Sequence, residues 1–134
     1  MTAPSGVLET CLYATDLDAA ERFYRDVVGL ESFARASGRH VFFRCGAHAV
    51  FLVFNPDATE RPGAGVPPHG ARGPGHVAFA VADDDLAGWR QRFARHGVPI
   101  EAEVEWPRGG RSLYVRDPAG NSVELAPARI WGLR

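Results

Sequence analysis

The spacing of hydrophobic residues changes along the chain in an order that occurs twice. In the first half, a β-prone run at 7–13 precedes helical spacing over 17–28, and strand-like runs follow near 31–36, 41–45 and 49–54. In the second half, a strand-like run at 76–82 precedes a helical pattern that ends at Gly97, and strands are expected at 100–105, 112–116 and 122–126. Each half therefore predicts the order β-α-β-β-β.

Polar and glycine landmarks support a true repeat. Glu9 and Asp16 are 7 positions apart, as are His76 and Asp83, and the two pairs are displaced by 67. Gly29 and Gly97 differ by 68, and Leu52 corresponds to Glu124 with a shift of 72. Such agreement predicts two related modules. We place them at 7–55 and 75–127, joined by a proline- and glycine-rich linker at 56–74 without regular structure and followed by a tail at 128–134.

Composition limits the class of protein. With 134 residues, of which 46% are hydrophobic, the chain is long enough for a single α+β domain with one core. A net charge of −1, with both signs interspersed, gives no reason to expect a nucleic-acid partner. No apolar run is long enough to span a membrane and no leader pattern begins the chain, so we expect a cytoplasmic protein. All fifteen basic residues are arginine, which excludes lysine-based catalysis.

Strand alternation places three polar residues on one kind of face. His76 shares a face with the small residues at 78 and 80, whereas the bulky residues at 77, 79 and 81 lie on the other. By the same alternation Glu124 lies opposite the apolar residues at 123 and 125, and Glu9 shares a face with Cys11 and Tyr13. These are equivalent strand positions, so the three side chains are expected to face one cavity.

One imidazole and two carboxylates form a suitable ligand set for a divalent metal. Mn²⁺, Fe²⁺, Co²⁺, Ni²⁺ and Zn²⁺ all accept such ligands, and the replacement of a second histidine by a carboxylate shifts the preference toward harder ions such as Mn²⁺ or Mg²⁺. We therefore predict a metal site at Glu9, His76 and Glu124. In the competing interpretation, Glu9 is a surface carboxylate and His76 is a hydrogen-bonded residue of the core.

Three segments carry a family resemblance. These are DLDAAERFYRDVVGL at 16–30, GHVAFAV at 75–81 and SLYVRDPAGNSVEL at 112–125, of which the DPAGN turn followed by VEL is the most specific. Together with the repeat they cover nearly the whole chain, which resembles the vicinal oxygen chelate superfamily of glyoxalases, bleomycin-resistance proteins and extradiol dioxygenases. The resemblance implies two β-α-β-β-β modules that form a U-shaped, barrel-like mixed sheet, with modules often exchanged between the subunits of a dimer.

The resemblance also implies where a metal would bind. Metal ligands of the superfamily lie on the first and last strand of each module, which corresponds to Glu9, Leu52, His76 and Glu124. His76 and Glu124 match the usual residue types, Glu9 stands where histidine is usual, and Leu52 cannot coordinate an ion. The three-ligand layout of fosfomycin-resistance thiol transferases and extradiol dioxygenases is closer than the four-ligand layout of glyoxalase I.

Further residues are candidates for contact with a small-molecule substrate. Ser112 and Tyr114 resemble the substrate-contacting strand of the thiol transferases. His69, in the linker, could fold over the cavity mouth as an acid, base or ligand, or could remain a solvated loop residue. Trp106 and Arg111 could contact an aromatic or anionic group, or could belong to a surface turn. The remaining candidates for this role are Cys11, Tyr13, Leu52 and Phe54.

Two functions remain open. The first is a metal-dependent enzyme of lyase, isomerase, thiol transferase or dioxygenase type, in which Glu9 or Glu124 moves a proton. The second is a metal-free protein that sequesters an aromatic compound, for which Leu52 and Glu9 argue. In both cases we expect a homodimer, because the open edge and face of the predicted U-shaped sheet would be covered by a second copy of the chain.

Overall fold

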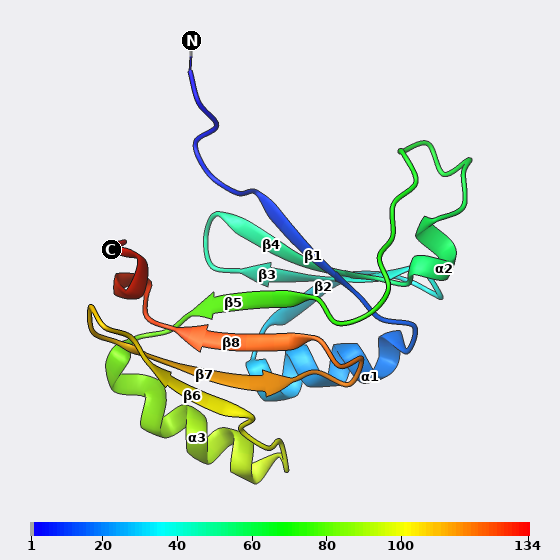
Figure 1. The fold of residues 1–134 in the computed structure, drawn as a ribbon. Coiled ribbons are helices and arrows are strands. Elements are labelled where there is room, and N and C mark those ends of the chain that lie inside the picture. Colours follow the sequence, from blue (N-terminus) through cyan, green and yellow to red (C-terminus); the bar gives the residue numbers. More distant parts are fainter. Residues whose placement is uncertain (1) are drawn as a thin grey trace. The chain divides into compact units, whose positions relative to one another are not determined.

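A computed structural model of the chain describes residues 2–134, which form two compact units. One unit extends to Gly73 and the other begins at Pro74. The first contains β1 (Glu9–Tyr13), α1 (Leu17–Arg22), β2 (Glu31–Ala36), β3 (His40–Cys45), β4 (Ala49–Phe54) and α2 (Pro56–Thr59). The second contains β5 (His76–Ala80), α3 (Leu86–Arg95), β6 (Ala102–Glu105), β7 (Arg111–Arg116) and β8 (Ser122–Ala126) (Figure 1).

Each unit is built on a four-stranded mixed sheet with the same topology. The strand orders are β1-β4-β3-β2 and β5-β8-β7-β6, and in both sheets the first and last strands pair in parallel while the others are antiparallel. Cys11 lies opposite Leu52 in one sheet, and Ala78 lies opposite Glu124 in the other. The α+β class and the repeat are confirmed, as is the equivalence of Leu52 and Glu124. Neither sheet closes on itself into a barrel.

The helix of the first unit widens along its length. Asp16 caps α1, accepting a hydrogen bond from the backbone N–H of Ala19 at 3.0 Å. The second half, Phe23–Val28, is wound as a π-helix rather than the α-helix that the spacing predicted. Four of its six side chains are buried, and Tyr24 packs against Phe43 and Phe51 of the sheet with ring centroids 5.8 Å and 4.7 Å away. Gly29 ends this turn at a φ of 90°, as expected for a left-handed cap.

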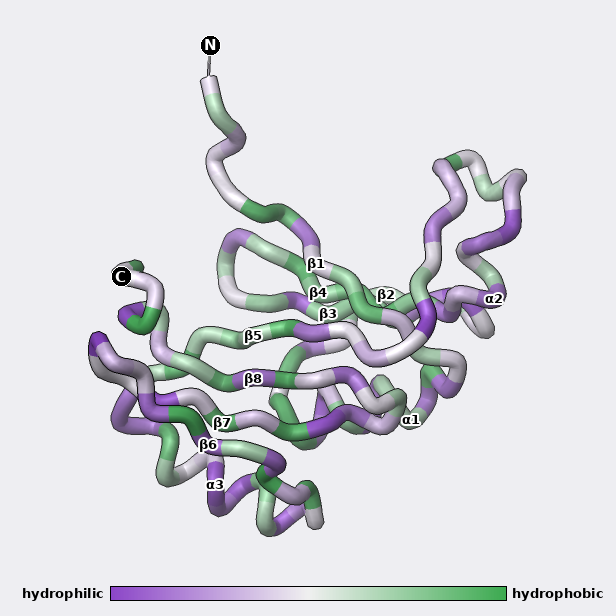
Figure 2. Tube along the Cα trace, viewed as in Figure 1, coloured by the Kyte–Doolittle hydropathy of each residue, from purple (hydrophilic) through white to green (hydrophobic). Residues whose placement is uncertain are grey.

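The helix of the second unit covers one face of its sheet. A 3-10 turn, Asp83–Asp85, leads into α3, whose Leu86 and Phe93 are buried. The sheet contributes buried side chains from the strand positions that alternation predicted, including Val77 and Phe79 of β5. Hydrophobic residues accordingly concentrate in the strands, whereas α3 carries both kinds (Figure 2). The opposite face of β5 carries His76 and two alanines and stays exposed.

Two segments differ from the sequence-based prediction. The first strand begins at Glu9 rather than at residue 7, and Leu8, which lies within the predicted run, is 74% exposed. The linker, expected to lack regular structure, contains α2 directly after the first module. Asn55 caps α2 by accepting from the N–H of Asp57, and Pro56 occupies the first turn, where proline needs no N–H partner. The capping hydrogen bond of Asn55 and the favourable position of Pro56 therefore allow a helix over these four residues, although the linker as a whole is rich in proline and glycine.

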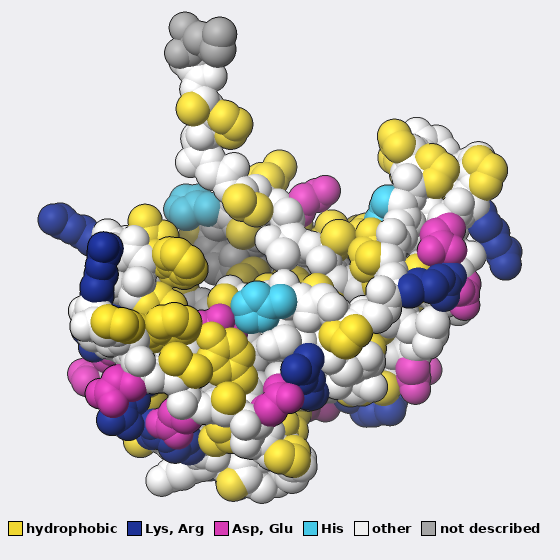
Figure 3. All heavy atoms as spheres, in the orientation of Figure 1, with side chains coloured by type: hydrophobic (Ala, Val, Ile, Leu, Met, Phe, Trp, Pro, Cys, Tyr) yellow, Lys and Arg dark blue, Asp and Glu magenta, His cyan; other side chains and the backbone are white. Residues whose placement is uncertain are grey.

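The surface carries no large block of one charge on the face that Figure 3 shows, where acidic and basic side chains are interspersed. Several ion pairs join them, among them Arg116 with Glu101 at 2.8 Å and Arg129 with Asp83 at 2.7 Å. Among residues 2–134, none of the helices combines the length and the apolar character needed to cross a bilayer.

Two glycines of the second unit give opposite predictions for stability. Gly97 has a φ of 67°, so Gly97→Ala should lower the free energy of unfolding by about 1 kcal/mol. Gly88 lies inside α3, and a methyl group added there would meet no atom within 4 Å, so Gly88→Ala should raise it by about 0.5–1 kcal/mol. Urea unfolding of both variants measures these changes. If both substitutions changed the free energy of unfolding in the same direction, the helix end described here would be contradicted.

Candidate functional site

The imidazole of His76 is oriented by the strand beside it. Its Nδ1 lies 3.1 Å from the backbone carbonyl oxygen of Ser122 on β8. A carbonyl only accepts hydrogen bonds, so Nδ1 carries the proton that is donated to it. In the neutral ring Nε2 then holds a lone pair, and this atom lies 3.3 Å from Oε1 of Glu124. The arrangement fixes the tautomer in which Nε2 can bind an ion.

The carboxylate of Glu124 is held from its other side. Ser112 Oγ donates to Oε2 of Glu124 at 2.5 Å, and the indole N–H of Trp106 donates to Ser112 Oγ at 2.8 Å. Ser112 is fully buried, and the side chain of Glu124 is only 8% exposed. One oxygen is therefore occupied by a buried donor chain, which leaves Oε1 directed toward the exposed imidazole.

Tyr114 lies next to this carboxylate. It pairs with Glu124 across β7 and β8, and its ring stacks beside that of His76 with centroids 6.3 Å apart. Burial and then the negative charge of Glu124 raise the pKa of Tyr114 above its ordinary value. The phenol therefore stays protonated at neutral pH and can donate a hydrogen bond to an oxygen atom of a ligand.

The DPAGN turn positions His76 from a distance in sequence. Asp117 Oδ1 accepts from the backbone N–H groups of Ala119 and Asn121, both at 2.9 Å. Asn121, which is buried, accepts from the N–H of Gly75 at 2.8 Å, and the Gly75 carbonyl accepts from Ser122 N at 2.9 Å. The turn thus holds the residue directly before His76, which explains physically why this signature accompanies the histidine.

His76 and Glu124 together fit a divalent ion. Two atoms that each lie about 2.0–2.2 Å from one ion are separated by roughly 3 Å, close to the 3.3 Å between Nε2 and Oε1. Both atoms offer lone pairs, and both side chains are oriented by further hydrogen bonds, as is usual around metal ligands. Within residues 2–134, no group of three or more His, Cys, Asp and Glu side chains is arranged as a metal site. The C-terminal unit therefore offers two candidate ligands.

The third predicted ligand lies in the N-terminal unit. Glu9 is exposed at the start of β1, opposite Val50, and shares its face of the sheet with Cys11 and Tyr13 as predicted. Leu52, on the same face of β4, is buried. Whether Glu9 joins His76 and Glu124 at one ion stays a prediction.

His69 lies against the sheet of the N-terminal unit. Tyr13 hydroxyl and His69 Nδ1 are hydrogen-bonded at 2.6 Å, and the His69 ring meets Phe54 edge-on with centroids 4.7 Å apart. Burial, followed by the charge of Cys11, raises the pKa of Tyr13 to about 12, so the phenol remains the donor at neutral pH. Three predicted substrate-contacting residues are thus brought together: Tyr13, Phe54 and His69.

Arg111 and Cys11 are placed differently from their neighbours. Arg111 lies on the face of β7 opposite Ser112, and its guanidinium is 3.7 Å from Glu103 and 3.6 Å from Glu105. The structure does not bring it to His76, because adjacent residues of a strand point to opposite faces. Cys11, a predicted substrate contact, is an exposed thiol whose Sγ lies 3.9 Å from the hydroxyl of Tyr13.

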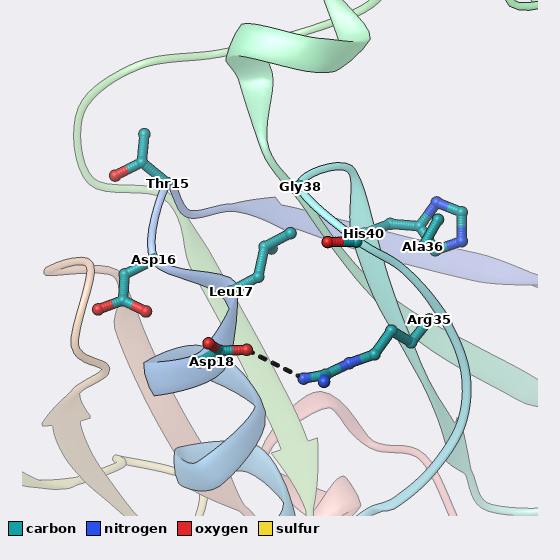
Figure 4. Close-up of a pocket in the computed structure, with 9 residues that line it drawn as sticks. Thr15, Asp16, Leu17, Asp18, Arg35, Ala36, Gly38 and His40 are labelled. Atoms are coloured by element: carbon teal, nitrogen blue, oxygen red, sulfur yellow. Dashed lines mark hydrogen bonds and ion pairs between the residues drawn. The ribbon is translucent and has the colours of Figure 1, made fainter.

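A cavity of about 470 Å³ at the start of α1 is used by the fold (Figure 4). Its Asp16 caps α1, and its Arg35 forms ion pairs with Asp18 at 3.2 Å and with Glu21. Figure 4 shows the dashed contact between Arg35 and Asp18, and the His40 ring directed away from Leu17. Because these charges already have partners, this cavity is a weaker candidate for a binding site.

Comparison with known proteins agrees with this geometry. A family model described as Glyoxalase/Bleomycin resistance protein/Dioxygenase superfamily matches residues 6–125, which is most of the chain. The chain belongs to this superfamily. The three segments that carry the resemblance lie within the match, as do His76 and Glu124.

Solved structures of the superfamily resemble the chain over nearly its whole length. A protein described as lactoylglutathione lyase from Agrobacterium tumefaciens is 47% identical, covering 98% of this chain and 100% of that one, with a TM-score of 0.93. A glyoxalase/bleomycin resistance protein/dioxygenase from Nocardioides is 20% identical (TM-score 0.73; 95% and 85% covered), and a glyoxalase/dioxygenase from Nostoc punctiforme is 21% identical (TM-score 0.70; 95% and 95%). The last two show the common fold.

Sequence reasoning missed several residues near these sites. The carbonyl of Ser122 orients His76, but a backbone atom leaves no trace in the side-chain pattern. Arg39, His40 and Phe42 line a groove together with Leu52 and Phe54. Strand alternation through 40–44 could have indicated that His40 and Phe42 share this face. Asn121 could have been found from its fixed place after the glycine of the turn.

Removal of the Ser112 hydroxyl should destabilise the C-terminal unit. Ser112→Ala leaves Oε2 of Glu124 and the Trp106 N–H without their buried partner, which lowers the free energy of unfolding by about 1–3 kcal/mol. Ser122→Ala keeps the backbone carbonyl that accepts from His76, and it should change the free energy of unfolding by less than about 0.5 kcal/mol. Urea unfolding followed by tryptophan fluorescence compares them, and equal stabilities would refute the role of Ser112.

Proposed function

We propose that the chain is a divalent-metal-dependent enzyme of the lyase type that acts on a small oxygenated compound. The observation that supports this most is the pair of donor atoms in the C-terminal unit, His76 Nε2 and Glu124 Oε1 at 3.3 Å, each oriented by a further hydrogen bond. A purely structural ion pair would not need an exposed imidazole, yet 51% of the His76 side chain is exposed while its partner is buried.

We propose Glu9 as the third ligand. It stands at the position equivalent to His76 in the repeat, at the first residue of β1, and its exposed carboxylate is free to ligate. Leu52 has no donor atom, so the fourth position of the four-ligand layout holds no ligand in this chain. The resulting set of one nitrogen and two oxygen ligands favours ions such as Mn²⁺ or Mg²⁺ and leaves positions for substrate.

The surrounding residues suit proton transfer at a carbon next to an oxygen. The ion would supply electrostatic stabilisation of negative charge that develops on substrate oxygens. Tyr114, kept protonated, donates a hydrogen bond to a substrate oxygen from beside Glu124. Glu9, which is exposed and has no buried donor chain like that of Glu124, is the better placed of the two carboxylates to exchange ligation for the role of base.

The relative at 47% identity supports lyase chemistry in particular. That protein is described as a lactoylglutathione lyase and matches all but 2% of this chain. We therefore propose lactoylglutathione as the first substrate to test. The metal-free alternative, sequestration of an aromatic compound, is supported by the aromatic face of the N-terminal unit, where His40, Phe42 and Phe54 gather.

Metal content and turnover should be measured together. Protein purified without chelators is expected to hold about one divalent ion per chain by elemental analysis and to convert lactoylglutathione. His76→Gln and Glu124→Gln remove one ligand each and should lower metal affinity and turnover by more than about tenfold. His96→Gln, an exposed histidine at the end of α3, is the matched control and should change neither.

Two results would contradict this proposal. Wild-type protein that remains metal-free after incubation with Mn²⁺, Zn²⁺, Ni²⁺, Co²⁺, Fe²⁺ or Mg²⁺ would favour the sequestration function. Retention of stoichiometric metal by Glu124→Gln would place the ion elsewhere.

We also propose a homodimer. Large apolar side chains are exposed near both ends of the chain, with Trp131 at 78%, Leu8 at 74% and Leu133 at 64% exposure. If these side chains pack together between two chains, the dimer buries apolar surface that a monomer would leave exposed to water. Light scattering at micromolar concentration should give about twice the chain mass of 14.5 kDa, and Trp131→Ser should shift the mass toward the monomer. A monomeric wild-type protein would contradict this.

A further inference from the structure

The N-terminal unit contains a groove that the metal ligands of the C-terminal unit do not explain. It encloses about 760 Å³ and lies on the face of the sheet opposite α1. Val50, Leu52 and Phe54 of β4 line its length, and the loop at 66–69 covers one side. Because successive residues on one face of a strand are about 6.7 Å apart, the floor from Val50 to Phe54 spans roughly 13 Å. This is long enough for a small ring system with a polar group at each end.

The groove is aromatic along its middle. His40 stacks on Phe42 with centroids 3.9 Å apart and an interplanar angle of 9°, and Phe42 meets Phe54 edge-on at 5.5 Å. Burial, then the charge of Arg39, lowers the pKa of His40 below its ordinary value, so its imidazole is neutral at pH 7 and behaves as part of an aromatic wall. A flat, apolar ring is the ligand group that such stacked and edge-on partners accommodate.

The two ends of the groove differ in charge. Glu9 lines the end at Val50, because these two residues pair across β1 and β4. Arg39 lines the opposite end, where its backbone carbonyl accepts from the N–H of Asn55, one residue after Phe54. Its guanidinium forms no ion pair with any residue in the described part of the chain, unlike Arg35 and Arg72 of the same unit. A cation at the end of an aromatic groove favours a carboxylate there.

The loop over the groove is held in place. The hydroxyl of Tyr13 is hydrogen-bonded to the ring Nδ1 of His69 at 2.6 Å, and the backbone N–H of His69 donates to the backbone carbonyl of Thr59 at 3.0 Å. Arg72 forms ion pairs with Asp57 and Glu60, both at 2.8 Å. Side chain, backbone and ion pair therefore fix the proline-rich segment against the sheet. The groove is thus a formed binding surface rather than a gap under a loose loop.

We propose that this groove binds a small aromatic carboxylate, with the ring against Phe42 and Phe54 and the carboxylate on Arg39. This inference rests on the proposed small-molecule function, and it adds a second class of ligand, held in the groove, to the lactoylglutathione named there. It does not depend on the metal, since no groove residue other than Glu9 belongs to the proposed ligand set. Arg39 would be the residue that determines specificity for an anionic end group.

Binding of 2-naphthoate and its neutral isostere 2-naphthamide tests the proposal. Calorimetric titrations of the full chain are made in EDTA and repeated with Mn²⁺. We expect 2-naphthoate to bind at least about tenfold more tightly than 2-naphthamide in both conditions, as one charge-assisted hydrogen bond predicts. Arg39→Met should reduce the affinity for 2-naphthoate to that for 2-naphthamide. Arg61→Met, an exposed arginine outside the groove, should leave both affinities unchanged.

A second variant separates the aromatic wall from the cation. Phe42→Leu keeps an apolar side chain of similar size and should weaken both ligands severalfold, with thermal unfolding used to confirm that each variant is folded. The proposal is overturned if neither ligand binds at millimolar concentration, if the two bind equally, or if Arg61→Met acts like Arg39→Met. Failure of the metal site alone would appear differently, because His76→Gln would lose metal yet still bind 2-naphthoate.

Discussion

A buried carboxylate sets the arrangement of the C-terminal unit. Glu124 lies in the middle of β8 with almost no exposure, where an ionised group is costly unless it is hydrogen-bonded or paired. Ser112 satisfies one oxygen, and Trp106 in turn holds Ser112. The other oxygen faces His76, whose ring is turned by the backbone of the same strand. The strand order, the DPAGN turn and the tautomer of the histidine all act on this one contact.

Equivalent faces of the two sheets carry different side chains. In both units the first and last strands pair in parallel with equivalent register, so that Leu52 occupies the position of Glu124. The C-terminal unit fills this face with polar donors around a carboxylate. The N-terminal unit fills it with aromatic rings and an apolar floor, with Arg39 at one end. The C-terminal unit thus presents donor atoms on this face, and the N-terminal unit presents an aromatic and apolar surface.

Much of the fold could be predicted from the sequence because its signals are local. Alternation placed Val77 and Phe79 in the core and left His76 on the open face, and helical spacing with Gly97 gave the end of α3. The π-helical winding at Phe23–Val28 could not be predicted, because it depends on packing four neighbouring side chains against a sheet. The short helix α2 followed from Asn55 and Pro56, whose capping chemistry was overlooked in favour of overall composition.

In the candidate site, too, residues with local sequence signals could be predicted, whereas contacts between distant segments could not. His76 and Glu124 were predicted from repeat position and alternation, and Ser112 and Tyr114 from the resemblance of their strand to that of the thiol transferases. The structure brings these four side chains together. Arg111, a predicted substrate contact, lies on the face of β7 opposite Ser112 and forms ion pairs with Glu103 and Glu105, so the structure does not group it with these four. The contact of His69 with Tyr13 spans 56 positions through a proline-rich loop, and nothing local to either residue specifies it.

Anomalous diffraction from crystals grown with Mn²⁺ tests the central claim most directly. We predict one strong anomalous peak per chain within coordination distance of His76 Nε2 and Glu124 Oε1, with the Ser112 hydroxyl still bound to the other carboxylate oxygen. Crystals without such a peak, in which His76 donates straight to Glu124 as a simple ion pair, would contradict it.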